Sequence, residues 1–412
     1  PWTEQRNMAE ILDLLADGRL SLEGLRGSVV PFERAPEAYD LLRSPSPPIS
    51  IVLDYEVREE ATKVDFGPSA TSRPAVDEAT TYMHLPRALN VSFIGLGNFA
   101  SSYLLPSVRA DQDVALQHVI TASPLKAEAI RSRAGFRHAG TDAVPAMSAP
   151  ETDVVFIATR HDTHARYAEA ALRANRAVFV EKPLALTDRE YDRVATALRA
   201  TQGRLMIGFN RRFAPATRWA LDALGTNRAG LRFLYRVNAG PLPANHWLLD
   251  PEIGGGRLIG EGCHFIDLAC FVAGALPSSI EARSLESHAG APPQSFHIEI
   301  AFPEATAGIE YIATGDPSLA KERIEIHRAG TSIVIDDFRS ATLYRSGKRR
   351  HKKWPGRDKG HRAEVHAFLE AVRTGSPTPI PEEESLRSTA LTLAAARSLR
   401  EARPIRQAEW AE

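Results

Sequence analysis

The segment LNVSFIGLGNFA, residues 89–100, constrains the fold most, because an apolar run leads directly into a glycine loop that an expected helix follows. In such a loop the first glycine allows a tight turn and the second lets the backbone approach a pyrophosphate. A small third residue lets the helix pack closely on the strand. The amides at the helix N-terminus then favour the phosphates. We interpret the loop as a dinucleotide site rather than a structural turn, with contacts from Gly95, Gly97, Asn98, Phe99 and Ala100.

The rest of the chain predicts an α/β protein. Four further short apolar strands, LQHVITA, TDVVFIAT, RAVFVEK and RLMIGF, follow the glycine loop with helical stretches between most of them. Strands that alternate with helices predict a doubly wound parallel sheet, the Rossmann arrangement, over 89–208. From 209 to 360, longer segments alternate apolar and polar residues and predict a large, mostly antiparallel open sheet with one covered face. Helices are expected over 361–412.

The N-terminal part has a different order of expected helices and strands. Residues 1–55 predict a helix, a strand, a helix and a strand, with the first helix in MAEILDLLADGRL. Residues 56–88 are polar and rich in proline, serine and glycine, which predicts a linker.

Charge and cysteine content exclude several classes of function. Lysine and arginine number 50 against 51 acidic residues, a net charge of −1, so no global field attracts nucleic acid or an anionic membrane. The two cysteines and the absence of a CxxC pattern predict a reducing compartment and no metal site. No apolar run approaches the roughly 18 residues of a membrane span. The N-terminus lacks the layout of a signal peptide, so we expect a cytoplasmic protein.

The end of the second strand bears on the choice of cofactor. The sequence VITASPLK places Thr121 and Ser123 where NAD-preferring proteins usually carry an acid for the ribose. Both hydroxyls can hydrogen-bond to a ribose hydroxyl or to a 2′-phosphate, and Lys126 is within reach of a phosphate. The sequence therefore leaves NAD and NADP open.

Two later segments carry the candidate chemistry. FVEKPLA ends a strand on Glu181 and Lys182, at the sheet edge where α/β proteins bind ligands, although a surface lysine on an ordinary turn is an equal alternative. GGGRLIGEGCH presents Glu261 and His264 behind three glycines and is either a flexible connection or a proton-transfer turn. A histidine can give or take a proton near pH 7, which suits the oxidation of an alcohol in both directions.

Five ordered motifs resemble those of the Gfo/Idh/MocA oxidoreductase family over about residues 88–402. They are GLGNFA, ATRHDTH, EKPLA, GFNRRFAP and GGGRLIGEGCHFIDL. The resemblance implies a Rossmann domain and an α/β domain whose open sheet mediates a homo-oligomer, a dimer or tetramer. It also implies hydride transfer between NAD or NADP and a secondary alcohol of a sugar, inositol or nucleotide-sugar.

The same resemblance assigns roles by position. Lys182 contacts the substrate hydroxyl, His264 is the general acid/base, and Glu261 is a further catalytic candidate. Thr159, His161, His164, Glu181 and Lys182 are expected along the cofactor, and Asn210, Arg211 and His264 at the substrate. His246 and Trp247 are expected at the substrate for another reason, since an aromatic face packs on a sugar ring, although a core tryptophan is an equal alternative. The family pattern carries an Asp four residues before the histidine, where this sequence has Gly260. Glu261 is displaced by one position, so it can orient the imidazole, bind substrate or cap the following helix.

Several alternatives stay open. A regulator or sensor on the same fold would bind cofactor without turnover, and a redox-neutral enzyme of glycosides would recycle its cofactor. Residues 1–55 resemble the C-terminal end of a zinc-type medium-chain dehydrogenase, or are an accidental extension. The basic run 345–362 is a solvated loop or a clamp for the phosphates of a nucleotide-sugar.

Overall fold

A computed structural model of the chain describes residues 14, 17–20, 27–31, 34–42, 44, 48, 50–54, 88–111, 113–285 and 292–410. The chain divides into two compact units, residues 1–81 and 82–412.

The first unit contains a small β-α-β arrangement. Strands β1 (Ser28–Pro31) and β2 (Ile51–Asp54) pair in parallel, and helix α2 (Ala35–Leu42) connects them. This confirms the expected strand-helix-strand order. Of the helix expected in MAEILDLLADGRL the structure describes only residues 14 and 17–20, and of the linker expected over 56–88 only residue 88.

The second unit begins with a six-stranded parallel sheet in the order β5-β4-β3-β6-β7-β8. This is the predicted Rossmann arrangement, with β3 at the point where the strand order reverses. The strands are β3 (Leu89–Ile94), β4 (Val114–Ile120), β5 (His138–Gly140), β6 (Val154–Ile157), β7 (Ala177–Val180) and β8 (Arg204–Ile207). Strand β5 was not predicted, because three residues give no hydrophobic period to recognise.

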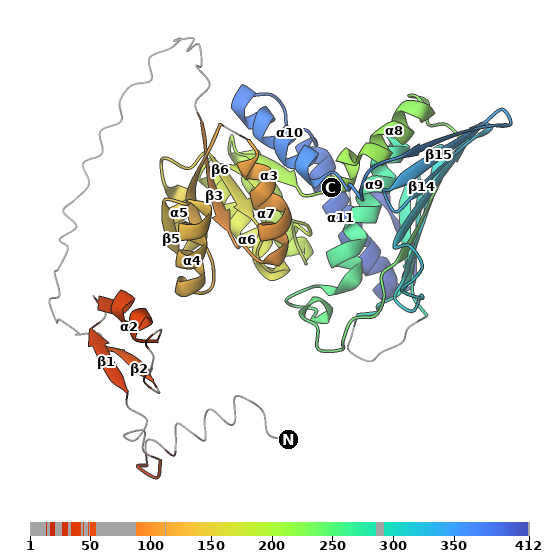
Figure 1. Cartoon of the computed structure of the whole chain (residues 1–412). Coiled ribbons are helices and arrows are strands. Elements are labelled where there is room, and N and C mark those ends of the chain that lie inside the picture. Colours follow the sequence, from red (N-terminus) through yellow and green to blue (C-terminus); the bar gives the residue numbers. More distant parts are fainter. Residues whose placement is uncertain are drawn as a thin grey trace. The chain divides into compact units, whose positions relative to one another are not determined.

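Helices flank this sheet, and its interior is aromatic (Figure 1). Phe156 stacks on Phe93 and Phe179 with ring centroids 5.0 and 4.9 Å apart. Phe368 of α10 meets Phe179 edge-on at 5.6 Å, so a helix from the end of the chain completes the core of this domain. The helices are η3 (Ala100–Leu104), α3 (Leu105–Arg109), α4 (Pro124–Ala134), α5 (Ala143–Ser148), α6 (His164–Arg173), α7 (Asp188–Ala200) and α10 (His361–Thr374).

A nine-stranded sheet forms the second domain of this unit, in the order β16-β15-β14-β13-β9-β12-β11-β10-β17. Only β9 and β12 pair in parallel, which confirms the predicted mostly antiparallel sheet. The strands are β9 (Leu231–Asn238), β10 (Ser279–Arg283), β11 (Phe296–Ala301), β12 (Ala305–Ile312), β13 (Glu322–Arg328), β14 (Thr331–Asp336), β15 (Ser340–Arg345), β16 (Lys348–Lys353) and β17 (Ile405–Arg406).

One face of this sheet is covered and the other is open. Helices α8 (Pro215–Leu224), α9 (Cys263–Ala273) and α11 (Glu382–Glu401) lie on the same side of the sheet (Figure 1). Alternate residues of β9, β11 and β13 are buried beneath them, and their neighbours point to the open face. Among the described residues, no helix combines the length and apolarity that crossing a bilayer requires.

Candidate active site

A cavity of about 560 Å³ opens between the Rossmann domain and the large sheet. Its lining joins segments that are far apart in the sequence: the glycine loop, the ends of β6 and β7, the turn before α9 and the segment before α10. Most of the predicted site residues share this lining: Gly97, Asn98, Phe99, Ala100, Thr159, His161, His164, Glu181, Lys182, Asn210, Arg211, Trp247, Glu261 and His264.

The glycine loop fits a dinucleotide. Gly95 has φ +83°, and a Cβ there would lie 2.6 Å from the carbonyl oxygen of Ala158, so this turn requires glycine. A Cβ on Gly97 would meet nothing within 4 Å, which leaves the backbone open to a ligand. The loop therefore has the tight turn and the bare backbone that a pyrophosphate needs.

Lys182 follows β7 in a cis Lys182–Pro183 peptide and lines the cavity. Its ammonium donates a hydrogen bond to the carbonyl oxygen of Gly260 at 2.8 Å. The ring of His164 lies against the carbonyls of Pro183, at 2.8 Å, and Thr159, at 3.2 Å, which fixes the segment that carries the lysine. The structure thus joins the lysine motif to the histidine turn, 78 residues further along the chain.

His264 is the second residue of α9, and its side chain reaches the cavity. Its Nδ1 is buried and has no hydrogen-bond partner among the described residues, which leaves Nε2 as the nitrogen that can meet a substrate. Burial lowers the pKa of His264 well below its usual value, and the positive charges of Arg211 and Lys182 lower the pKa further. The imidazole is therefore neutral at pH 7 and can accept a proton.

The turn before His264 is helical, but it is not an α-helical turn. Residues Leu258–Gly262 form a π-helix, η7, which is wider than an α-helical turn. A Cβ on Gly260 would lie 2.6 Å from Cδ1 of Leu248 and 2.9 Å from Cε1 of His161. The imidazole of His161, which bonds to the Gly254 carbonyl at 2.8 Å, thus fills the space beside Gly260.

Glu261 does not cap α9, which has no side-chain cap hydrogen bond. Its carboxylate accepts a short hydrogen bond from the hydroxyl of Tyr311 on β12 and lies 3.9 Å from Arg257. Burial raises the pKa of Glu261, but Lys321, Tyr311 and Lys182 outweigh burial, so the net pKa is lowered. Glu261 therefore stays charged at neutral pH, where it contacts the Tyr311 hydroxyl and the Arg257 guanidinium.

The pKa of Glu181 is shifted in the opposite direction from that of Glu261, upward. Its buried carboxyl lies where Gly208 has no side chain, since a Cβ there would be 3.0 Å from Oε1. Burial raises the pKa of Glu181 to about 7, although the neighbouring Lys182 opposes the shift. The side chain is therefore partly protonated at neutral pH beside Lys182.

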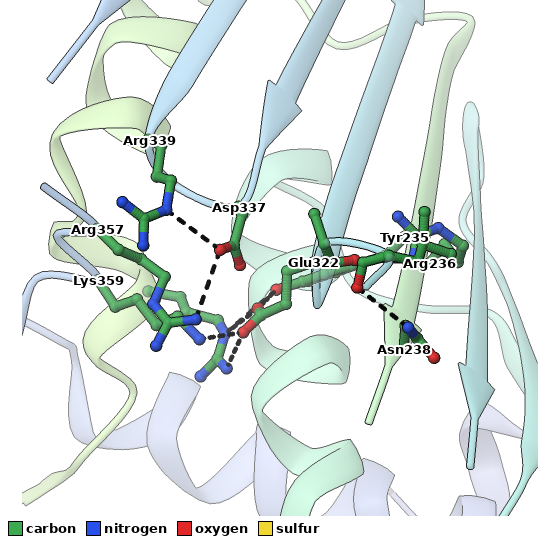
Figure 2. A network of polar contacts seen from close by, with 11 residues as sticks. Tyr235, Arg236, Asn238, Glu322, Asp337, Arg339, Arg357 and Lys359 are labelled. Atoms are coloured by element: carbon green, nitrogen blue, oxygen red, sulfur yellow. Dashed lines mark hydrogen bonds and ion pairs between the residues drawn. The ribbon is translucent and has the colours of Figure 1, made fainter. Parts of the chain in front are cut away.

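A cationic wall completes the cavity on the side of the large sheet. Glu322 at the start of β13 pairs with Arg211 at 2.8 Å and also binds Lys359 and the Tyr235 hydroxyl. These charges hold the pKa of Glu322 far below its usual value despite burial. Figure 2 shows Lys359 reaching Glu322, and Asp337 between Arg339 and Arg357. One buried carboxylate thus orders two cations that face the cavity.

Several predicted contact residues do not line the cavity or are already hydrogen-bonded within the protein. Gly95 does not line the cavity and instead allows the close approach of the loop to the Ala158 carbonyl. Asn210 lines the cavity, but its side-chain amide donates a hydrogen bond to the Lys359 carbonyl. The Thr121 hydroxyl donates to the carbonyl of Ser123, whose own hydroxyl caps α4. His246 accepts a hydrogen bond from the amide of Leu248 through Nδ1, while its neighbour Trp247 lines the cavity.

Sequence reasoning missed several residues of the second domain and of the segment that leads into α10. Tyr311 and Arg257 hold Glu261, and Lys321, Arg357, Lys359 and His361 line the cavity. Among the sequence features, only the basic run 345–362 indicated further cations for binding a ligand. Its β16 part is exposed, but its last residues, 357–361, reach the cavity.

Comparison with known proteins agrees with this geometry. Residues 89–209 match the NAD-binding Rossmann fold of the Gfo/Idh/MocA oxidoreductase family, and residues 231–406 match its C-terminal alpha/beta domain. The chain belongs to this family. The resemblance of residues 1–55 to a medium-chain dehydrogenase stays a prediction.

The relatives of this oxidoreductase include dehydrogenases of polyols and sugars. An inositol 2-dehydrogenase of Rhizobium meliloti is 26% identical over 73% of this chain and 93% of its own length. A myo-inositol 2-dehydrogenase of Thermotoga maritima is 21% identical over 78% and 99%. The structure of a levoglucosan dehydrogenase in complex with NADH and levoglucosan has a TM-score of 0.69 at 22% identity, over 77% and 99% of the two chains, and shows the same fold.

Proposed function

We propose that this protein oxidises a secondary alcohol of a sugar, inositol or nucleotide-sugar and reduces NAD or NADP. The observation that carries the proposal is the meeting of Lys182 and a neutral His264 in one cavity with the glycine loop. The names of the inositol and levoglucosan dehydrogenases support the substrate class.

The two side chains divide the work on the substrate hydroxyl. The nicotinamide, when bound, accepts the hydride from the carbinol carbon. His264 takes the hydroxyl proton, because a neutral imidazole is the form that can act as a base. Lys182 stabilises the negative charge that develops on the oxygen, and its bond to Gly260 keeps the ammonium in place.

Charge on the cavity wall refines the substrate class. Five lysine and arginine side chains line the cavity, against the carboxylates of Glu181 and Glu261. Among these, Lys321 makes no ion pair within 4.0 Å among the described residues, and Lys359 shares Glu322 with Arg211. This surplus favours a substrate with a carboxylate or phosphate, such as a uronic acid or a nucleotide-sugar, over a neutral polyol.

A substrate screen tests the proposal. The whole chain is incubated with myo-inositol, glucose, levoglucosan, glucuronate and UDP-glucose, each with NAD and with NADP, and reduced cofactor is followed by absorbance. We expect turnover of at least one compound, and a higher kcat/KM for the anionic members. The hydroxyls of Thr121 and Ser123 are hydrogen-bonded within the protein, so they do not indicate which of the two cofactors is preferred. The screen therefore compares NAD and NADP directly.

The other outcomes identify the alternatives. Cofactor binding without turnover of any compound would favour a regulator or sensor. Product formation at constant absorbance would favour redox-neutral glycoside chemistry. A preference for neutral polyols would refute the proposal of an anionic substrate, but it would still support the proposal that the protein is a dehydrogenase.

We further propose that the open face of the large sheet forms a homo-oligomer, a dimer or tetramer. Leu234 on β9 is 50% exposed on this face, between Arg232 and Arg236 of its own strand and opposite Glu325 of β13. An exposed apolar side chain on a broad sheet suits a contact with a second copy. Light scattering after gel filtration should show an oligomer that Leu234→Glu dissociates, and a monomeric wild type would contradict the proposal.

A further inference from the structure

Two histidines and a glutamate gather on the Rossmann sheet, and none of the three lines the cavity. His118 of β4 and His138 of β5 are register partners in parallel strands, and their rings stack with centroids 4.8 Å apart. Glu151 lies in the turn before β6. One ligand atom from each residue lies within 4.8 Å of the other two.

A buried hydrogen-bond chain fixes the tautomer of His118. The Thr152 hydroxyl donates to the carbonyl oxygen of Ala146 at 3.0 Å, so its oxygen can only accept from Ser92 at 2.9 Å. Since the single proton of Ser92 is used in this way, its oxygen accepts from Nδ1 of His118 at 3.2 Å. Ser92 and Thr152 are fully buried, so no solvent water competes.

This chain leaves a free lone pair on Nε2 of His118, which is the form that binds a metal. Histidine ligands usually donate their second N–H to a neighbouring acceptor, which orients the ring.

We propose that His118, His138 and Glu151 bind a divalent transition metal of the zinc class. Two imidazoles and a carboxylate, with water in the fourth position, are a ligand set that zinc accepts. At Zn–N distances of about 2.0–2.1 Å, tetrahedral ligand atoms lie about 3.4 Å apart, so the cluster must contract slightly. His138 and Glu151 are exposed and can rotate to do this.

The site would act as a clamp on a weak edge of the domain. Strand β5 has three residues and lies at the edge of the parallel sheet. A metal would tie β5 to β4 and to the turn before β6. The amide of Thr121 donates to the carbonyl of Gly140 at 3.1 Å, so the clamp would also steady the end of β4.

The sequence could not predict this site, because its three residues come from separate elements. His118, His138 and Glu151 have no spacing of the CxxC or HxxxH type. Only the parallel register of β4 and β5 brings the two imidazoles together.

Metal binding to the chelator-stripped whole chain tests the proposal. Zn²⁺ is titrated by calorimetry, and Co²⁺ is followed by its visible absorption, which reports imidazole ligation. We expect one site that raises the melting temperature, and we expect His138→Gln and Glu151→Gln each to weaken binding more than tenfold. Because both side chains are exposed, these variants should fold, which circular dichroism checks.

Two further variants separate a built site from adventitious binding. His297→Gln removes an exposed imidazole that lies 2.9 Å from Glu310, a matched pair without a second histidine, and should leave binding unchanged. Ser92→Ala retains all three ligands and should weaken binding about 10- to 100-fold through loss of the orienting hydrogen bond. Wild-type binding no tighter than that of the double variant His118→Gln/His138→Gln would overturn the proposal.

Discussion

The buried carboxyl groups on the two sides of the cavity have opposite pKa shifts, although the histidines His161, His164 and His264 are neutral on both sides. On the Rossmann side, buried groups are driven toward their neutral forms: the pKa of His161 is lowered to about 3, that of His164 to about 4, and that of Glu181 is raised to about 7. On the side of the large sheet, Arg211 and Glu322 are equally buried but remain charged as an ion pair.

The difference shows how each side recognises its ligand. The Rossmann side offers backbone and neutral groups, which suits a large cofactor held by its phosphates at a glycine loop. The opposite side keeps cations in fixed positions through Glu322, which suits selection of a small polar substrate. Lys182 belongs to the Rossmann side by sequence but bonds to Gly260 of the other domain, so it links the two.

The largest effect is expected from removal of this link. Lys182→Met should lower kcat about 1,000-fold, since the charge on the developing alkoxide loses its partner. Cofactor affinity, measured by fluorescence titration, should change little because the glycine loop is intact. Lys348→Met on the exposed strand β16 is the matched control. Unchanged turnover in Lys182→Met would remove this lysine from the chemistry.

The second-largest effect is expected from Glu322, the buried carboxylate on the large-sheet side of the cavity. It tests whether the stability and substrate binding of that side depend on this carboxylate. Glu322→Gln leaves Arg211 buried without a charged partner, and loss of one partner of a buried pair costs about 3 to 5 kcal/mol. We expect this loss in urea unfolding, together with a higher KM and unchanged cofactor affinity. Glu325→Gln on the same strand removes a more exposed pair and should cost less than about 1 kcal/mol. Equal losses in the two variants would contradict the contrast drawn above.

A smaller effect is expected where the family residue is put back. In Gly260→Asp, the new side chain must displace His161 and Leu248, and overpacking of this kind costs about 1 to 3 kcal/mol. Activity should fall rather than rise, because the imidazole of His161 occupies the space. Higher activity at unchanged stability would show that Glu261 is a poor substitute for the missing aspartate.

The smallest effect is expected on the pH dependence of stability, through the neutral histidines His161 and His164 of the Rossmann side. Their folded-state pKa values, about 3 and about 4, lie below the unfolded value of 6.5. Their contribution to stability is therefore complete above pH 6.5 and is lost as the pH falls toward 4 and then 3. At pH 6 each histidine should cost about 1 kcal/mol, measured by urea unfolding against pH 7.5. Constant stability between these pH values would contradict the neutral Rossmann side.

The same contrast explains how far the sequence could predict the molecule. The glycine loop, the EKP turn and the histidine turn are short contiguous segments whose residue types carry their own geometry, so the parallel sheet and most of the cofactor side were predicted. The opposite wall is set by the register of β9, β12 and β13, which brings together Tyr235, Tyr311 and Glu322. No local pattern encodes that register. The medium-chain dehydrogenase origin of residues 1–55 and the cytoplasmic location stay predictions.

The central claim is that a neutral His264 faces the substrate beside a cationic wall. Imidazole NMR of the cofactor-bound enzyme, with the His264 signal assigned by its loss in His264→Gln, tests this claim independently of the substrate's identity. The account predicts that His264 remains neutral from pH 8 to below its usual pKa of 6.5. An imidazole that becomes charged at or above pH 6.5 would contradict it.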